Sequence, residues 1–456
     1  MIYLLYRITH YKGEIIIMKY YLGIDLGASS GRHIVGYYDE NNVLQLDEVY
    51  RFSNGFDSND SSKLYWDIDK LYTEVKNGIK KAILKYKKIE SLSIDTWGVD
   101  YVLMDNDKEI LPVYAYRNNR TKSIISDLHN IMSFEELYDI TGSQFQEFNT
   151  IYQLYWDKVN GRLDKANNFL YMPEYLIYKL TGVMMHESTI ASTSNLLDKD
   201  SLQYSKYIIN KLGFNEKLFY KLEKPGKFVG YLKKEIQEVV DGNIKVVLCA
   251  THDTASAVEG ISMNESSIYI SSGTWSLLGV KLNKVINNEK ARKANYSNEY
   301  GPDYIRFQKN IMGLWIIQCL SKEMNISFTD MVKLSQESSY QEIYDVNDNC
   351  FLVTSNMKNE IINWFKRRNI DYPKQDMDII NSTYHSLAFS YKLAIEELED
   401  IISQKFDNLY IVGGGAKNEY LNSLTRKYTL KNVIALPVEG AIIGNILMQM
   451  RNSNEN

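Results

Sequence analysis

Cysteine is scarce in this sequence, and long apolar runs are absent. Its 456 residues include three cysteines, Cys249, Cys319 and Cys350, which show no paired spacing. This pattern argues against a disulfide scaffold or a metal cluster and is typical of a reducing compartment, so we expect a cytoplasmic protein. No apolar run approaches the ~20 residues of a membrane-spanning helix. Residues 1–17 contain only short apolar runs interrupted by charges, which do not make a signal-peptide core.

An excess of positive charge is also absent. The net charge of -5 leaves no basic footprint for nucleic acid, and we expect neither nucleic-acid nor membrane partners. The length suits two domains of roughly 200 residues each. We expect an N-terminal extension at 1–17, with Met18 as an alternative start, and domains at 18–260 and 261–456.

Several enzyme signatures are missing. The six histidines show no zinc-like spacing, and His186-Glu187 lacks the second histidine of a zincin. No Gly-x-Ser-x-Gly sequence of an α/β-hydrolase occurs. No Walker lysine is found, since Gly31 is followed by Arg32, and the turn at Gly413–Gly415 lacks the later glycine of a dinucleotide fingerprint. These absences argue against a metalloprotease, an α/β-hydrolase, a P-loop enzyme and a Rossmann dehydrogenase.

Two hairpins with small-residue turns stand out among the features that are present. Residues 20–26 and 34–38 predict two strands joined by a turn of Gly, Ala and Ser, with Asp25 at the end of the first strand. Residues 267–270 and 271–276 repeat a strand and a small-residue turn. Such turns have little side-chain bulk, so their backbone N–H groups can close on an anion. The two hairpins therefore predict two phosphate-binding halves.

The order of predicted elements is repeated along the chain. The first half continues with a strand at 43–52, a helix from Ile68 and a strand at 91–95. The second half continues with strands at 276–280 and 304–308, a helix from Ile311, a long helix at 377–403 and a strand at 409–412. This repetition predicts a duplicated α/β fold with its ligand between the halves. Residues 145–247 lie between the halves and are predicted to be a mostly helical, substrate-side insertion.

The segment from Asp95 to Asp100 combines a strand-terminal carboxylate with Trp97 and Gly98. Carboxylates and glycine backbone groups bind hydroxyls, and an indole face covers the apolar side of a sugar ring, so the segment indicates a sugar site. The alternative is that Trp97 belongs to the core and Asp100 to a turn.

Asp253 follows an apolar strand and precedes a helix-forming run. It can be an ordinary helix N-cap or a base that takes a proton from a substrate hydroxyl during phosphoryl transfer. His252 can position substrate or make a structural hydrogen bond. Gly413–Gly415, after a strand and before a helix, would allow close approach of a nucleotide, although this signal is weak alone.

Taken in order, these segments resemble the FGGY carbohydrate kinases of the actin-like ATPase superfamily, from Met18 onward. The segments that carry the resemblance are 25–32, 95–100, 252–257, 271–276 and 309–315. The resemblance implies a duplicated actin-like (ribonuclease H-like) two-domain fold with a cleft between the domains.

The resemblance also implies site residues. Asp253 is the implied catalytic base, and Asp25 is implied at Mg²⁺, through water. The implied ATP-binding residues are Ala28, Ser29, Ser30, Gly31, Arg32, Thr274, Gln318, Gly414 and Gly415. The implied sugar-binding residues are Asp95, Gly98, His252, Asp253, Thr254 and Asn310.

The implied reaction is the phosphorylation of L-rhamnulose at O1 by ATP, with Mg²⁺. Alternatives are another kinase of this family, acting on L-fuculose, a pentulose or glycerol, and a nucleotide-dependent sugar-binding regulator without transfer. An activator with an iron–sulfur cluster on the same fold would need clustered cysteines, which the sequence lacks. We expect a monomer or a small homo-oligomer.

Overall fold

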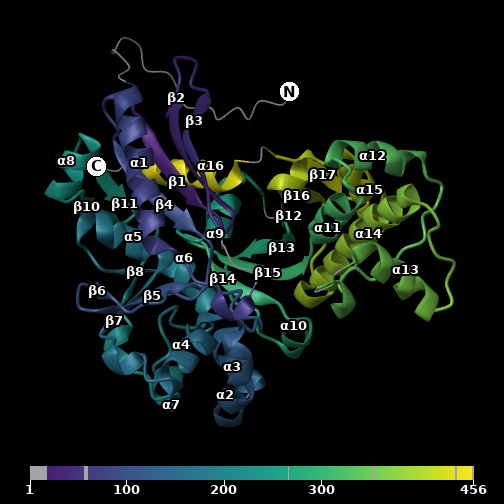
Figure 1. Cartoon of the computed structure of the whole chain (residues 1–456), viewed down its shortest axis with the longest axis horizontal. Helices are drawn as coiled ribbons and strands as arrows, with labels where there is room; N and C mark the ends of the chain where they lie inside the picture. Colours follow the sequence, from purple (N-terminus) through teal and green to yellow (C-terminus); the bar gives the residue numbers. More distant parts are fainter. Residues whose placement is uncertain are drawn as a thin grey trace. The chain divides into compact units, whose positions relative to one another are not determined.

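A computed structural model describes residues 18–55, 60–264, 266–352, 354, 356–436 and 439–453. The predicted extension at 1–17 lies outside these residues. The chain divides into two compact units (Figure 1). The first unit comprises Met1–Gly260, Glu299–Tyr304 and Ala441–Asn456, and the second comprises Ile261–Asn298 and Ile305–Gly440. The first unit therefore contains two segments that are distant in sequence from its main part.

The first unit is built on a six-stranded mixed sheet. Its strands follow the order β10-β11-β4-β1-β2-β3, with β1 antiparallel to β2 and parallel to β4. The bounds are β1 Tyr21–Leu26, β2 Ser30–Tyr38, β3 Leu44–Ser53, β4 Ser91–Thr96, β10 Phe228–Tyr231 and β11 Lys245–Val247. The short turn between β1 and β2 carries the first small-residue motif.

The sheet of the second unit repeats this order. Five of its strands follow the order β15-β13-β12-β16-β17, with β12 antiparallel to β13 and parallel to β16. The bounds are β12 Ser267–Ser272, β13 Trp275–Leu282, β14 Ser297–Tyr300, β15 Ile305–Met312, β16 Asn408–Val412 and β17 Asn432–Ala435. In position and direction β12 corresponds to β1, and β16 to β4. The predicted duplication of the α/β fold is thus confirmed.

Helices cover both faces of the first sheet. The apolar residues of α1 (Ile68–Tyr86) recur every three or four positions, and they are buried together with Leu22 and Ile24 of β1. Helices α5 (Met172–Thr181) and α8 (Lys234–Val240) join the same core. Helix α16 (Gly440–Ser453) packs with Tyr21, which points to the other face because side chains alternate along a strand. The C-terminal helix thus completes the layer opposite α1.

In the second unit, strand β15 is longer than the sequence predicted. We expected a helix from Ile311, but Ile311 pairs with Ser276 and Met312 with Trp275 in the sheet. That prediction was wrong because both side chains are buried against the sheet, and the chain leaves it only at Gly313. The helix that follows, α11, runs from Trp315 to Met324.

The predicted long helix is α14 (Asp376–Ile402), and it packs against α12 and α15. The other helices are α2 Ile125–Ile131, α3 Phe134–Thr141, α4 Thr150–Val159, α6 Ser188–Ala191, α7 Lys206–Lys211, α9 Asp253–Glu259, α10 Glu289–Lys293, α12 Phe328–Glu337, α13 Met357–Arg367 and α15 Glu419–Thr429. The smaller strands are β5 Tyr101–Asp105, β6 Lys108–Glu109, β7 Asn168–Tyr171, β8 His186–Glu187 and β9 Leu222–Glu223.

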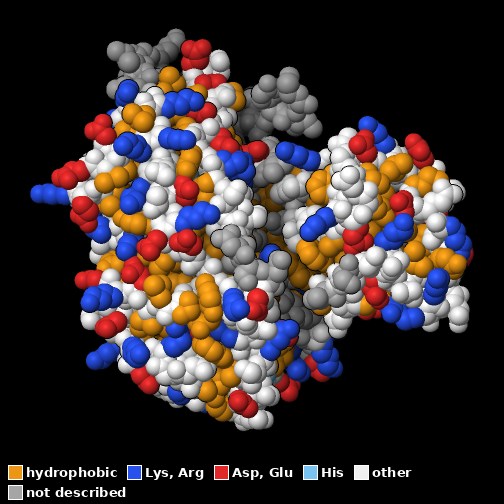
Figure 2. All heavy atoms as spheres, in the orientation of Figure 1, with side chains coloured by type: hydrophobic (Ala, Val, Ile, Leu, Met, Phe, Trp, Pro, Cys, Tyr) orange, Lys and Arg blue, Asp and Glu red, His pale blue; other side chains and the backbone are white. Residues whose placement is uncertain are grey.

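The surface mixes charges of both signs. On the face shown in Figure 2, Lys and Arg side chains alternate with Asp and Glu side chains over both units. Among the described residues, we find no helix with the length and apolar character needed to cross a bilayer.

Candidate active site

Two carboxylates lie side by side where β1 and β4 end. The strands are parallel and in register, and Asp25 pairs with Asp95 across them. Arg32, on β2, donates through Nε to Asp25 Oδ2 at 2.8 Å, and its Nη2 lies 2.8 Å from the same oxygen. The guanidinium therefore compensates the charge of Asp25 beside the first small-residue turn.

Asp95 is fully buried. Its Oδ2 accepts from Asn445 Nδ2 of α16 at 2.7 Å, whereas its Oδ1 has no hydrogen-bond partner among the described residues. Burial raises the pKa of Asp95 well above its usual range, repulsion from Asp25 raises it further, and the bond from Asn445 opposes this shift. An unsatisfied buried acceptor of this kind calls for a donor from a ligand or water.

Internal hydrogen bonds define the first small-residue turn. Gly27 N donates to Ser30 O at 2.9 Å, and Asn54 Nδ2 donates to Gly27 O at 2.9 Å. Ser29 is exposed at the tip, while Ala28 and Ser30 are partly buried. The turn is thus fixed at its base and open to solvent at its tip, as an anion-binding turn requires.

Gly98 lies at a tight approach between two segments. A Cβ atom there would stand 3.0 Å from Thr193 Cγ2 and 3.3 Å from His252 Nε2. The next residue, Val99, has φ of 68°, a value that β-branched residues rarely adopt, and its N–H donates to Thr193 Oγ1 at 3.0 Å. Backbone strain of this kind is typical of functional sites. The structure thus brings Gly98 and His252 together, as a shared substrate site requires.

Trp97 and Asp100 support this loop from the interior. Trp97 is 6% exposed, and its ring lies 4.0 Å from that of Trp66, which supports the interpretation of Trp97 as a core residue. Asp100 follows a bend at residues 98–99, where it is fully buried and accepts N–H donors from Trp66, Trp97, Tyr116 and Gln153. Burial raises the pKa of Asp100 to about 6, and the hydrogen bonds from Trp66, Tyr116 and Gln153 oppose the shift.

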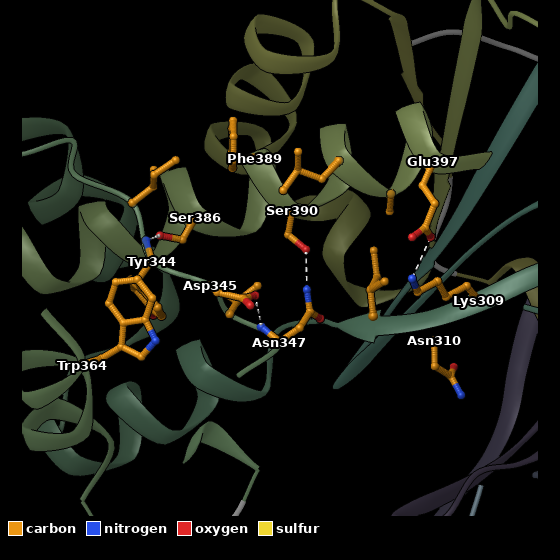
Figure 3. A pocket seen from close by; sticks show the side chains of 15 residues that line it. Lys309, Asn310, Tyr344, Asp345, Asn347, Trp364, Ser386, Phe389, Ser390 and Glu397 are labelled. Carbon is orange, nitrogen blue, oxygen red and sulfur yellow. Dashed lines mark hydrogen bonds and ion pairs between the residues drawn. The ribbon is translucent and has the colours of Figure 1, made fainter. Parts of the chain in front are cut away.

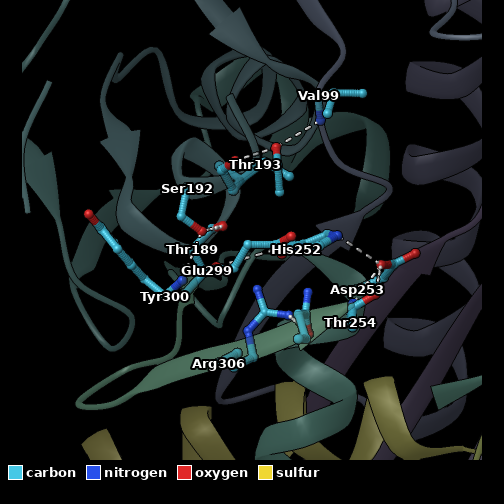
Figure 4. A network of polar contacts seen from close by, with 12 residues as sticks. Val99, Thr189, Ser192, Thr193, His252, Asp253, Thr254, Glu299, Tyr300 and Arg306 are labelled. Carbon is cyan, nitrogen blue, oxygen red and sulfur yellow. Dashed lines mark hydrogen bonds and ion pairs between the residues drawn. The ribbon is translucent and has the colours of Figure 1, made fainter. Parts of the chain in front are cut away.

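Asp253 is the first residue of α9, and His252 is the N-cap residue. The interpretation of Asp253 as the N-cap is therefore wrong. His252 lies between two carboxylates, with Nε2 3.5 Å from Asp253 Oδ1 and Nδ1 3.4 Å from Glu299 Oε2 (Figure 4). One imidazole can thus bridge Glu299 and Asp253.

Hydrogen bonds orient the carboxylate of Asp253, which remains accessible to solvent. Its Oδ1 accepts from Thr254 N at 2.5 Å and from Thr254 Oγ1 at 3.1 Å. Removal of water raises the pKa of Asp253; His252 lowers it, and the charge of Asp25 raises it. The side chain is still 34% exposed, so a substrate hydroxyl can reach it. A reachable carboxylate with a raised pKa is suited to general-base chemistry.

Sequence reasoning missed a buried carboxylate that supports the His252 loop. Glu187 Oε2 accepts from Thr251 N at 3.2 Å, Thr251 Oγ1 at 2.6 Å and Thr189 Oγ1 at 2.6 Å. His252 N in turn donates to Thr189 Oγ1 at 3.4 Å (Figure 4). The sequence singled out this carboxylate only in testing for a zincin. Contacts between segments distant in sequence bring three residues to the site, namely Glu187, Thr193 and Glu299. No local sequence pattern predicts such contacts.

The second unit gathers another group of predicted residues. Thr274 Oγ1 donates to Gln318 Oε1 at 3.2 Å. Gly413 has φ of 83°, and a Cβ there would stand 2.6 Å from Ser272 O, two residues before Thr274. Gly415 lies against the Ser272 side chain, whereas a Cβ at Gly414 would meet no atom within 4 Å. The turn at Gly413–Gly415 thus abuts the second small-residue hairpin.

Asn310 lies on β15, paired with Leu277 of β13. Its neighbour Lys309 donates to Glu397 Oε1 at 2.7 Å and faces a cavity of about 500 Å³ against α14. Figure 3 shows Asn310 projecting from β15 away from the Lys309–Glu397 pair, as alternation along a strand requires.

The residues present fit a magnesium ion held largely by a nucleotide. Among the described residues, no group of three or more His, Cys, Asp or Glu side chains is placed to hold a metal. Mg²⁺ in kinases usually keeps several waters and binds one or two carboxylates plus substrate phosphates. Asp25 offers such a carboxylate next to the first turn.

Family models match both halves of the chain. The model described as FGGY family of carbohydrate kinases, N-terminal domain, matches residues 20–260, and that of the C-terminal domain matches 268–453.

Curated relatives and solved structures are similar over most of the chain. A protein named Rhamnulokinase from Oceanobacillus iheyensis is 42% identical over 94% of this chain and 92% of its own. One of the same name from Halalkalibacterium halodurans is 40% identical over 95% and 93%. The ligand-bound xylulose kinase of Lactobacillus acidophilus is similar in fold, with a TM-score of 0.80 at 16% identity over 96% of this chain and 90% of that one.

Proposed function

The chain belongs to the FGGY family of carbohydrate kinases, and we propose that it transfers the γ-phosphate of ATP to O1 of L-rhamnulose. The proposed sugar rests on the relatives named Rhamnulokinase, which match nearly the full length of this chain. The proposed chemistry rests on one observation above all: the reachable carboxylate of Asp253 lies beside His252, which in turn contacts Gly98.

Asp253 acts as the general base in this proposal. Its carboxylate accepts the proton of the C1 hydroxyl as O1 bonds to the γ-phosphorus and the bond from phosphorus to the β-phosphate oxygen breaks, which releases ADP. His252 lies between Asp253, on its Nε2 side, and Glu299, on its Nδ1 side, and in this proposal it orients Asp253 and the sugar. Exclusion of water from the site prevents wasteful hydrolysis.

The proposal also assigns residues to the sugar. We assign Asp95, Gly98, His252, Thr254 and Asn310 to sugar binding. The close approach at Gly98 supports this assignment, because the lack of a side chain lets its backbone lie next to His252. The unsatisfied Oδ1 of Asp95 is an acceptor for a hydroxyl or a bound water.

The two small-residue turns bind the phosphates of ATP. Residues 28–32 contribute backbone N–H groups and the Arg32 guanidinium, and Thr274 with Gln318 contributes polar side chains. Gly414 and Gly415 allow the nucleotide to approach the β16 end of the second sheet. Asp25 would hold Mg²⁺ through water, and the ion supplies charge neutralisation on the phosphates when it is bound with ATP.

A coupled assay of ADP release across a ketose panel tests this proposal. The ketoses are L-rhamnulose, L-fuculose, D-xylulose and D-fructose, and the triol glycerol is assayed beside them, each with ATP and MgCl₂. We expect kcat/KM for L-rhamnulose to exceed that of every other acceptor at least tenfold. A preference for L-fuculose or D-xylulose would overturn the sugar assignment, and ADP release independent of any acceptor would overturn the transfer.

A further inference from the structure

We propose that a second pocket of the first unit, distinct from the residues assigned to ATP and the ketose, binds an anionic monosaccharide. The pocket has a volume of about 630 Å³ and is lined by the rings of Tyr65, Tyr114 and Trp156 and by the cations Arg120 and Lys122. This volume is within the range of small-molecule sites, roughly 300–1,000 Å³. Neither Asp nor Glu is among the described residues that line it. The pocket thus combines aromatic surface with two cationic side chains and has no carboxylate among the described residues of its lining.

Arg120 is the central feature of this pocket. Its guanidinium carbon lies 4.3 Å from the ring centre of Tyr114 and 5.7 Å from that of Trp156. Nη2 donates to Gln153 Oε1 at 2.6 Å, but Nε and Nη1 are buried without a hydrogen-bond partner in the part of the chain that the structure describes. Unsatisfied donors on a charged group are unfavourable. Hydrogen bonds from Nε and Nη1 to an anionic acceptor would therefore offset the cost of a small shift of Arg120.

Lys122 and Tyr65 indicate that the anion carries a sugar ring. Lys122 Nζ stands 3.7 Å from Glu147 Oε2 with both side chains largely exposed, and such a pair is weak enough to exchange for a ligand. Tyr114 has the Arg162 guanidinium 5.1 Å from its ring centre, in addition to Arg120. Tyr65 is 40% exposed and offers its ring to the C–H face of a sugar. A bare inorganic anion would leave this aromatic surface unused.

The pocket is connected to the Gly98 loop by hydrogen bonds. Gln153, which accepts from Arg120, donates through Nε2 to Asp100 Oδ1 at 3.2 Å and to Val99 O at 3.3 Å. A ligand that draws Arg120 away from Gln153 would therefore alter the support of the strained Val99. This step rests on the proposed function, because it predicts that occupancy changes KM for the ketose.

Calorimetric titration of the full chain tests the site. The probes are D-fructose 1-phosphate, D-gluconate, inorganic phosphate and neutral D-fructose. We expect the phosphorylated sugar, the carboxylated sugar or both to bind, and we expect Lys122→Gln and Tyr65→Ala each to weaken that binding at least fivefold. Lys63→Gln is the matched control, since Lys63 is an equally exposed lysine (68% against 66%) outside the pocket, and it should leave Kd unchanged.

Several results would overturn the site. These are the absence of binding by either anionic sugar, equal binding by inorganic phosphate, and binding that Lys122→Gln leaves unchanged. Binding weakened by Asp253→Asn but not by Lys122→Gln would place the ligand at the ketose site instead. A ketose KM that the bound probe does not change would overturn the connection through Gln153. The titration requires no turnover, so its outcome is independent of the ketose panel.

Discussion

Asp253 can take a proton only when it is ionised, and its surroundings oppose ionisation. Loss of hydration and the charge of Asp25 raise its pKa, while His252 and Thr254 lower it less. A raised pKa means that the base is lost at a higher pH than for an ordinary aspartate. We expect kcat/KM for the ketose to fall as pH falls through this raised pKa, which a pH profile at saturating ATP measures. A profile that stays flat down to pH 4 would contradict the assignment.

Replacing Asp253 tests the same role directly. Asp253→Asn keeps the shape of the side chain but removes proton acceptance, so we expect turnover to fall by about 10²- to 10⁴-fold. ATP affinity, measured by titration with a non-hydrolysable analogue, should change little. Asp303→Asn, at an aspartate 82% exposed, is the control and should keep wild-type turnover. Near-normal turnover of Asp253→Asn would mean that another group accepts the proton.

Glu187 supports the same loop through its hydrogen bonds. In Glu187→Gln, one acceptor oxygen becomes an NH₂ group that cannot accept from Thr251 or Thr189. Buried donors left unsatisfied cost about 1–3 kcal/mol each, so we expect a lower melting temperature and a higher ketose KM with little change in ATP KM. Glu216→Gln, at an exposed glutamate, should change neither. An equal rise in both KM values would show a general loss of structure instead.

At the scale of elements, the turn between β16 and α15 contains two neighbouring glycines with opposite requirements. Gly413 has φ of 83°, and a Cβ would stand 2.6 Å from Ser272 O, whereas a Cβ at Gly414 would meet nothing within 4 Å. We expect Gly413→Ala to destabilise the protein by about 1–3 kcal/mol in denaturant unfolding. Gly414→Ala should be nearly neutral in stability but raise KM for ATP. A neutral Gly413→Ala would contradict the steric reason, and an unchanged ATP KM in Gly414→Ala would remove Gly414 from the nucleotide site.

Elements with a strong local pattern could be predicted from the sequence, and those defined by distant pairing could not. The apolar spacing of α1 and α14 is visible along the chain, and both helices form as expected. The end of β15 was misplaced because Ile311 and Met312 suit a helix as well as a strand. Only their pairing with Ser276 and Trp275 of β13 decides between the two.

The same distinction applies to the candidate site at the scale of the whole molecule. From the sequence, Asp25 and Asp95 could each be placed at the end of a strand, whereas their contact follows only from the parallel pairing of β1 with β4. Their third neighbour, Asn445, comes from a helix about 350 residues further along the chain and has no motif of its own. The three-part composition of the first unit, with Glu299–Tyr304 and Ala441–Asn456 added to its main part, is likewise a property of the folded chain alone.

The contacts of helix α16 therefore stabilise the first unit. Its Ile442 and Ile446 are fully buried against β1 and β2, and Gln449 Nε2 donates to Leu22 O of β1 at 3.0 Å. Deleting residues 441–456 would expose this apolar surface and leave Asp95 Oδ2 without Asn445. We expect hydrogen exchange to accelerate in β1 and β4 and to stay slow in β12 and β16, as mass spectrometry of peptides can measure.

A milder variant keeps this prediction testable if the truncated chain does not accumulate. Asn445→Leu removes the bond to Asp95 and keeps the helix, so exchange in β4 should accelerate more than exchange in β16. Leu393→Ala is the control, because Leu393 is 51% exposed on α14 of the second unit and should alter neither strand. If exchange rose equally in β4 and β16 of Asn445→Leu, the two units would unfold as one cooperative body, and the assignment of α16 to the first unit alone would fail.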